Sequence, residues 1–529
     1  MLRQAWKPVA ASVAAGGAGY YYYYYYTSAR QSFEIPVRTV GESGQRGMSK
    51  KTIQLLSMEE VNKRLIQNAS TETVRRPYGT TWHHTTASLS SNDPIEDANS
   101  QQIIQRDETD KSGPGDYLFF SVFDGHRGPE TSTLLSRSLI RAVALELSQL
   151  AADAKTPLSA PSILQNVTSM LWPGSKPTPA TGSASDPQNV SLAIEKAFTA
   201  LDWHLLNAPL TLLKEAIQNQ PSKDQVPDLS KHPMAMKTML PAISGSCALM
   251  AIFDTSHQDL YVACAGDSRA VAGIWQPGEN GKGAWVVDVL SEDQTGRNPN
   301  EAERIISEHP KDEAEYVIKN GRILGGLEPS RAFGDARYKW PAEIQDILNQ
   351  VFMIGNGMPM RKAPITLKTP PYVTARPVVT HRKLSFEDSS SIRFVVIATD
   401  GLWDELRSEE VVGLVGGYLA GLKGSIPKRD LPSLVPTTTT NAGIDGKMNK
   451  KADNSGTWAF VDDNVSSHLI RNALGGGDEL ALRKIMSIPA PYSRRYRDDI
   501  TVTVIWWEKG QEEQANSASI SLEAVKSKL

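Results

Sequence analysis

Two apolar runs of this chain end in the same dipeptide, Asp-Gly, and this repeated ending constrains the fold more than any other feature. The runs are residues 119–124 and 394–400, and a glycine follows each of them. A short, almost wholly apolar run is typical of a buried strand. The glycine permits a tight turn and lets the backbone approach a ligand. We therefore expect Asp124 and Asp400 to lie at the rim of a β-sheet.

Carboxylates that meet at such a rim need a positive charge. Asp-Gly after a strand is also a strong hairpin signal, so either dipeptide taken alone is more often only a turn. Ionised carboxylates a few ångströms apart repel by several kcal/mol at an effective dielectric constant of about 20. Oxygen ligands favour magnesium or manganese over zinc. The only cysteines, Cys247 and Cys264, lie in apolar runs and are expected to be packed free thiols.

Further acidic blocks accompany the two Asp-Gly turns in a fixed order along the chain. They are Asn92-Asp93-Pro94-Ile95-Glu96-Asp97, Gly266-Asp267-Ser268-Arg269, Ser330-Arg331-Ala332-Phe333-Gly334-Asp335 and Arg497-Asp498-Asp499. Together, and over residues 75–507, the blocks resemble the metal-dependent type 2C serine/threonine protein phosphatase family. The resemblance implies an α+β fold, a four-layer αββα sandwich of two central antiparallel sheets flanked by helices.

The resemblance also implies a site for two Mg²⁺ or Mn²⁺ ions at one end of the sandwich. Asp124 is expected to bridge the two ions, and the carbonyl oxygen of Gly125 to bind the second. Asp400 and Asp498 are expected to complete the ligands of the first ion. Water is then expected to attack phosphorus directly, without a phosphoenzyme.

Other acidic residues of the blocks are given supporting roles by the same resemblance. Glu96 and Asp97 are expected to act through waters on the metals, or else to be only a turn pair. Asp267 and Asp404 match positions that hold a weaker third ion in the family. His126 follows the first Asp-Gly directly and is expected to protonate the departing alkoxide as general acid.

Some residues of the blocks are expected to be structural, and two positions depart from the family pattern. Arg331 and Asp335 fit a polar network at the sheet rim better than direct substrate contact. The broader family has a phosphate-clamping arginine where this chain has Asn92. It also has Asp-Asn where this chain has Asp498-Asp499. These departures resemble the mitochondrial branch of the family that includes the pyruvate dehydrogenase phosphatases.

The amino terminus favours a mitochondrial location independently of that resemblance. Residues 1–33 contain no Asp or Glu but do contain Arg3, Lys7 and Arg30, as an organelle presequence does. Residues 9–27 are uncharged and include seven tyrosines at positions 20–26. Since tyrosine prefers the interface to the hydrocarbon, this stretch is marginal as a span. Two alternatives stay open: an inner-membrane anchor, facing the matrix or the intermembrane space, or a presequence that is removed.

The expected organisation is one catalytic domain with appendages. Helices are predicted from Ser57, with a capping-box start, and over residues 132–150; strands are predicted over 246–253, 260–265, 393–398 and 500–507. The expected divisions are a presequence at 1–30, a loose linker with a lead-in helix at 31–74, the phosphatase domain at 75–508 and a polar tail at 509–529. Surface-loop inserts are expected near 152–187, 218–233 and 423–454.

The resemblance implies metal-dependent hydrolysis of phosphoserine and phosphothreonine on proteins in mitochondria, and its mitochondrial branch suggests the pyruvate dehydrogenase complex as substrate. The net charge of −3 gives no reason to expect a nucleic-acid partner. A non-catalytic scaffold of the same fold is the alternative from another class, although a scaffold has no physical need for converging carboxylates. A hydrolase of small phosphoesters is a further alternative, and dependence on substrate length would distinguish it.

Overall fold

The computed structural model describes most of the chain between residues 31 and 509. The described ranges are 31–40, 46–76, 80–106, 115–153, 186–219, 226–278, 283–386, 391–441, 443 and 454–509.

Two large β-sheets form the centre of these described ranges. One sheet has five strands in the order β16-β10-β9-β6-β5, and the other has seven in the order β19-β12-β11-β17-β21-β4-β3. The strands of the first sheet are β5 Ala98–Gln105, β6 Asp116–Phe123, β9 Ala248–Asp254, β10 Asp259–Ala265 and β16 Val378–Lys383. Those of the second are β3 Ala69–Arg75, β4 Thr80–Leu89, β11 Arg269–Pro277, β12 Gly283–Val289, β17 Ile392–Ala398, β19 Thr437–Asn441 and β21 Ile500–Lys509.

Alternation along the strands explains why the sheets stack. In β6, Leu118, Phe120 and Val122 point to a core between the two sheets, where they meet Trp82 of β4. Phe119 points to the opposite side, as period-two geometry requires. A strand that is apolar on both faces is stable only when both faces are covered. The apolar run that ends at Asp124 is therefore a central, doubly buried strand.

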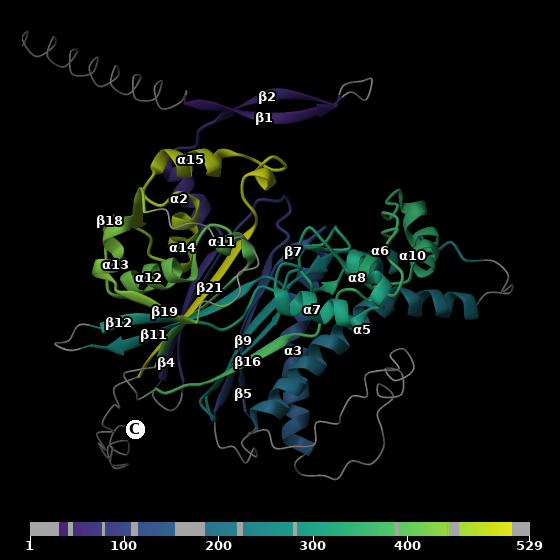
Figure 1. The fold of residues 1–529 in the computed structure, drawn as a ribbon, viewed down its shortest axis with the longest axis horizontal. Helices are drawn as coiled ribbons and strands as arrows, with labels where there is room; N and C mark the ends of the chain where they lie inside the picture. Colours follow the sequence, from purple (N-terminus) through teal and green to yellow (C-terminus); the bar gives the residue numbers. More distant parts are fainter. Residues whose placement is uncertain are drawn as a thin grey trace, which may run out of the picture.

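Helices cover the outer face of each sheet and complete four layers (Figure 1). On the five-stranded sheet lie α3 Glu130–Asp153 and α5 Pro187–Gln218, and against the seven-stranded sheet lie α2 Met58–Ile66, α12 Ser408–Leu419 and α14 Val465–Leu474. The predicted αββα sandwich is thus confirmed. The 32-residue helix α5 was not predicted, although Asp186 caps its first turn and Pro187 begins it.

The amino-terminal part of the described chain is more ordered than predicted. The helix from Ser57 is confirmed, with the capping box between Ser57 and Glu60 present. The loose linker is wrong, because β1 Ser32–Val40 and β2 Arg46–Gln54 form an antiparallel hairpin. The boundary at residue 75 is also wrong, because β3 belongs to the seven-stranded sheet.

The inserts need a similar correction. Residues 423–454 were predicted to be a surface loop, but they contain β18 Gly424–Pro427, α13 Leu431–Leu434 and β19. Strand β19 pairs in parallel with β12, so the seven-stranded sheet is not wholly antiparallel. The described part of the insert near 218–233 begins at residue 226. Ser230 is buried there, and the residues on either side of it donate hydrogen bonds to the carbonyl oxygens of Val351 and Gly355. The insert near 152–187 falls almost entirely outside the described residues.

Both predicted ends of the chain also fall outside the described residues. The presequence or anchor at residues 1–30 and nearly all of the tail at 509–529 are not described. Within the described ranges, the longest helices are too polar to cross a bilayer.

A buried ion pair anchors the segment 330–335 beside α7 Pro299–Glu308. Arg331 donates to Glu301 at 2.7 Å, and Arg304 also pairs with Glu301 at 2.7 Å. Burial alone would raise the pKa of Glu301, but hydrogen bonds from Arg331 and Arg304 outweigh it and lower the pKa to about 2. Arg331 therefore belongs to a structural network, and the segment it holds ends at Asp335.

We predict that Arg331→Met lowers the free energy of unfolding by about 3–5 kcal/mol, because it leaves a buried carboxylate short of a partner. Urea denaturation at neutral pH measures this loss. A group with a depressed pKa stabilises the fold above its ordinary pKa and loses that contribution as the pH falls through the folded value. The difference between wild type and variant should therefore shrink between about pH 4.5 and pH 2. Adding Glu301→Gln should recover part of the loss; equal stability of wild type and Arg331→Met would contradict the role of the pair.

Candidate metal centre

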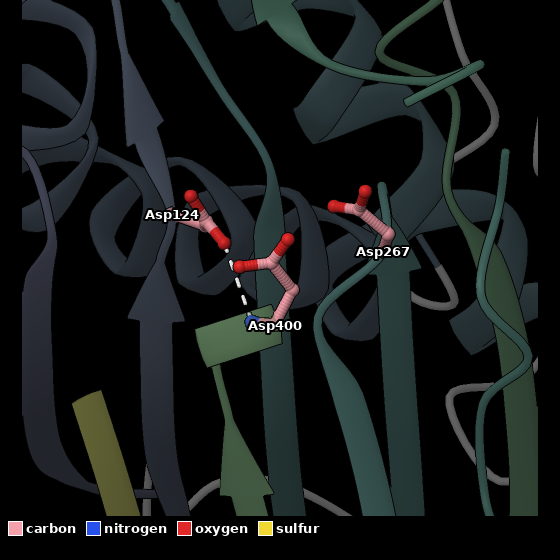
Figure 2. A group of neighbouring side chains, drawn as sticks. All are labelled: Asp124, Asp267 and Asp400. Carbon is pink, nitrogen blue, oxygen red and sulfur yellow. Dashed lines mark hydrogen bonds between the residues drawn. The ribbon is translucent and has the colours of Figure 1, made fainter. Parts of the chain in front are cut away.

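Three carboxylates from separate parts of the chain meet at one end of the sandwich. One ligand atom from each of Asp124, Asp267 and Asp400 lies within 4.8 Å of the others. Figure 2 shows the three side chains pointing toward a common space. Asp124 follows β6, Asp400 follows β17, and Asp267 lies in the connection between β10 and β11. The backbone N–H of Asp400 also donates to Asp124 at 3.3 Å. The expectation that the two Asp-Gly turns meet is therefore confirmed.

The electrostatics of this group show that the protein alone does not balance its charge. Burial raises the pKa of Asp124 well above its ordinary value, and the charges of Asp400, Asp97 and Asp267 raise it further. Burial, with the charges of Asp499 and Asp400, likewise raises the pKa of Asp97. Oxygen donors at this spacing with unfavourable mutual charge fit a hard divalent cation. The residues present therefore fit magnesium or manganese.

A small three-stranded sheet fixes the turn after Asp124. Strands β7 Gly125–His126, β8 Gly245–Ser246 and β15 Phe333–Gly334 pair in the order β15-β8-β7. The N–H of Cys247, next after β8, donates to the carbonyl oxygen of Asp124 at 2.9 Å. Three loops far apart in sequence are thereby fixed around one aspartate.

Glycine is required at the first position of β7. A Cβ atom on Gly125 would lie 2.0 Å from the carbonyl oxygen of Glu96. That same carbonyl accepts a 2.5 Å hydrogen bond from the hydroxyl of Ser132 in α3. The metal role predicted for the Gly125 carbonyl stays a prediction, but the structure gives an independent reason for a glycine here.

His126 is paired with a carboxylate that sequence reasoning placed only in a structural network. Its Nε2 lies 2.6 Å from Oδ2 of Asp335, which is fully buried. Burial opposes the charge on His126, but the carboxylate of Asp335 outweighs it and raises the pKa of the imidazole. A Cβ on Gly245 would lie 2.1 Å from this Nε2, so the pair packs directly on glycine backbone. The 209-residue separation of the two partners left no local sequence signal.

Asp498 is not a member of the three-carboxylate group among the described residues. Its carboxylate contacts Arg494 and accepts a hydrogen bond from the N–H of Asp499 at 2.7 Å. A Cβ on Gly401 would lie 2.1 Å from the carbonyl oxygen of Asp499, so this loop packs against the turn after Asp400. The loop position agrees with a ligand role for Asp498, and that role stays a prediction.

The neighbouring Asp499 is a hydrogen-bond centre that the sequence did not reveal. One carboxylate oxygen accepts from the N–H groups of Ser91 at 2.5 Å and Asn92 at 2.9 Å. The other accepts from the N–H of Glu96 at 2.8 Å and from the Asn92 amide at 3.1 Å. The two departures from the family pattern, at positions 92 and 499, are therefore in direct contact with each other.

The remaining predicted residues surround the group in different ways. Glu96 accepts from the N–H of Gly128 at 2.6 Å, and burial raises the pKa of its carboxyl. Asp97 is buried and accepts from the hydroxyl of Thr399 at 2.9 Å. Asp404 follows the short helix α11 Asp400–Trp403, with its N–H bonded to the carbonyl of Asp400. A third ion at Asp267 and Asp404 stays a prediction.

An αββα sandwich with carboxylates that meet at one end is the arrangement expected of an enzyme that uses divalent metal ions. Comparison with known proteins makes the assignment specific. The protein phosphatase 2C family matches residues 187–420. A protein phosphatase 2C homologue of Schizosaccharomyces pombe is 36% identical over 428 residues, which cover 80% of this chain and 79% of that protein.

Mitochondrial relatives are similar over comparable lengths. The mitochondrial pyruvate dehydrogenase phosphatase 1 of Saccharomyces cerevisiae is 35% identical, covering 89% of this chain and 76% of that protein. The human mitochondrial pyruvate dehydrogenase phosphatase 2 is 31% identical, covering 74% and 72%. The chain belongs to the protein phosphatase 2C family, and it is a protein serine/threonine phosphatase.

We predict that Asp124→Asn stabilises the metal-free protein at neutral pH. Two like charges within 4.8 Å of each other repel by about 3–4 kcal/mol at an effective dielectric constant of about 20, and the amide removes one of them. Because the raised pKa of Asp124 already lowers its charge in the metal-free protein, urea denaturation after chelation should show a gain of up to this size. Added Mg²⁺ or Mn²⁺ should stabilise the wild type and have much less effect on the variant.

Asp93→Asn is a matched control, because Asp93 is an exposed aspartate of the neighbouring block. It should leave both measurements unchanged. A metal-free wild type as stable as Asp124→Asn, with no response to either ion, would show that the carboxylates do not form a cation site.

Proposed function

We propose that this phosphatase hydrolyses phosphoserine and phosphothreonine with two Mg²⁺ or Mn²⁺ ions, in mitochondria, and that the pyruvate dehydrogenase complex is its substrate. The convergence of Asp124, Asp267 and Asp400 carries the proposal. The names of the relatives support the compartment and the substrate.

The chain offers a ligand set for the ions. The carboxylates of Asp124, Asp400 and Asp498 and the carbonyl oxygen of Gly125 would bind the two ions. Asp267 would bind a third ion more weakly. Bound ions of this kind neutralise phosphoryl charge and activate water. The strand ends and the β15-β8-β7 sheet hold the side chains in place, so that their repulsion is met by a rigid scaffold.

The protein's own contribution to bond cleavage is the proton for the leaving alkoxide. An alkoxide is a poor leaving group near neutral pH, so a positioned acid contributes about 10²–10⁴-fold. His126 lies two residues from Asp124, and its Nε2 is bonded to Asp335. Asp335 orients the imidazole and favours its protonated form. His126 is thus the proton donor, and Asp335 positions it.

We predict that Asp124→Asn abolishes metal-dependent release of phosphate from a phosphoserine peptide, because the site loses its central ligand. Release of inorganic phosphate measures the loss, and circular dichroism with the denaturation above checks that the fold is kept. Normal turnover by this variant would refute the site. Wild-type protein that binds metal but releases no phosphate from any phosphopeptide would favour the scaffold alternative.

We also predict that His126→Ala slows hydrolysis of alkyl phosphoesters by about 10²–10⁴-fold and of aryl phosphoesters with good leaving groups far less. An aryl leaving group needs no proton, so the two substrate classes should diverge. Parallel kcat measurements on a phosphoserine peptide and p-nitrophenyl phosphate give the comparison. Equal losses on both would remove the general-acid role.

The substrate is tested separately from the chemistry. Purified protein should release phosphate from the phosphorylated pyruvate dehydrogenase complex faster than from unrelated phosphoproteins. The phosphoproteome of mitochondria that lack the chain should show gain of phosphate on that complex. Gain confined to other proteins would assign a different substrate and leave the hydrolytic proposal intact.

A further inference from the structure

The acidic site has to accept a substrate group that is itself negatively charged. A phosphoserine carries a charge of about −1.5 to −2 at neutral pH and three strong acceptor oxygens. A protein cation beside the carboxylates would bind these oxygens and discriminate in favour of phosphorylated side chains. The broader family has an arginine for this purpose at the position of Asn92, but Asn92 is neutral.

The side-chain amide of Asn92 is committed to carboxylates. It donates to Glu96 at 3.0 Å and to Asp499 at 3.1 Å. An amide nitrogen has two N–H donors, so these two bonds use its donor capacity. Asn92 therefore organises the loop and has no donor left for a phosphoryl oxygen.

Arg494 places a guanidinium at the same corner of the site. It lies in the turn Ser493–Arg495, and its side chain pairs with Asp498. Its positive charge also acts on Glu96, where it opposes the effect of burial on the carboxyl pKa. Arg494 thus lies near both Glu96 and Asp498, and its side chain is 43% exposed to solvent.

The turn that carries Arg494 is firmly attached to the residues before Glu96. The hydroxyl of Ser493 donates to the carbonyl oxygen of Ser91 at 2.5 Å. Arg497 donates to the carbonyl oxygen of Ser90 at 3.0 Å, and Asp499 binds the N–H groups of Ser91 and Asn92. The position of Arg494 is therefore set by the framework that Asn92 and Asp499 build.

We propose that Arg494 binds the phosphoryl group of the substrate, in place of a cation at position 92; the inference rests on the proposed hydrolysis of phosphoserine at this site. A guanidinium presents a planar fork of donors that matches two phosphoryl oxygens. If Asp498 were a ligand of a metal ion, Arg494 would keep donors to spare for the substrate.

Arg127 is a second cation near the site, and it is exposed beside His126. Its backbone is in the left-handed region at φ 64°. The positive charge of Arg127 acts on His126. Arg494 instead lies near Glu96 and pairs with the predicted metal ligand Asp498. Arg494 is for this reason the better-placed phosphoryl ligand.

The test measures binding as well as turnover. A fluorescent peptide with a non-hydrolysable phosphonate analogue of phosphoserine is titrated with full-length protein in Mn²⁺, and anisotropy gives Kd. Arg494→Ala should weaken binding about 10- to 100-fold, with a matching rise in KM for the phosphoserine peptide. Arg494→Lys should recover part of the affinity, since it keeps the charge but not the fork. The unphosphorylated peptide should bind all variants equally weakly.

Arg495→Ala is the matched control, because Arg495 lies in the same turn but reaches the carbonyl oxygen of Pro36 in the hairpin. It should leave Kd and KM unchanged. The proposal would be overturned if Arg494→Ala kept the wild-type Kd and KM and only bound Mn²⁺ more tightly in calorimetry. Arg494 would then be no more than a counter-ion of Asp498. An effect of Arg127→Ala alone would also overturn it. Absence of phosphate release by the wild type would instead refute the proposed function, since the phosphonate titration does not depend on turnover.

Discussion

Repulsion between carboxylates at the end of the sandwich is the constraint on which the rest of the structure depends. Asp124, Asp267 and Asp400 approach within 4.8 Å of one another, and each pair of charges at that distance is unfavourable by several kcal/mol. A flexible chain would separate them. The protein holds them together because each follows a strand whose apolar residues are buried on both faces. The free energy that keeps the site together is therefore supplied by the core between the two sheets.

Two local devices transmit this rigidity to the loops. The β15-β8-β7 sheet ties the turn after Asp124 to the segment that ends at Asp335. The carboxylate of Asp499 ties the loop after the turn Ser493–Arg495 to the turn before Glu96 through four hydrogen bonds. Both devices use backbone groups at the loops, where the chain leaves regular structure and would otherwise leave donors without partners. Because the loops at the strand ends are fixed in this way, the carboxylates stay close together despite their repulsion.

The sequence predicted those features that depend on short-range pattern. Apolar runs gave β6, β9, β10, β17 and β21, and the Ser57 capping box gave α2, because periodicity and capping are local. It failed where long-range pairing decided the outcome. The hairpin of β1 and β2 is polar and stabilised by contacts with Ile488, and the threonine run of β19 becomes a strand only because β12 offers an edge. The contacts of His126 with Asp335 and of Asn92 with Asp499 join residues hundreds of positions apart, which a single sequence does not specify.

The last of these contacts gives physical meaning to the departures from the family pattern. Replacing an arginine by Asn92 removes a positive charge, and replacing an asparagine by Asp499 adds a negative one. An arginine at position 92 would form an ion pair with Asp499 and have fewer donors free for phosphate. Asn92 instead adds one amide donor to the three backbone N–H groups that already bind Asp499. Together, the amide and the carboxylate satisfy each other, but the corner becomes more negative. A cation that enters from the adjoining turn, as Arg494 does, restores the balance that phosphoryl binding needs. Asn92 thus donates the structural hydrogen bonds on one loop, and Arg494 supplies the phosphate-binding cation from another.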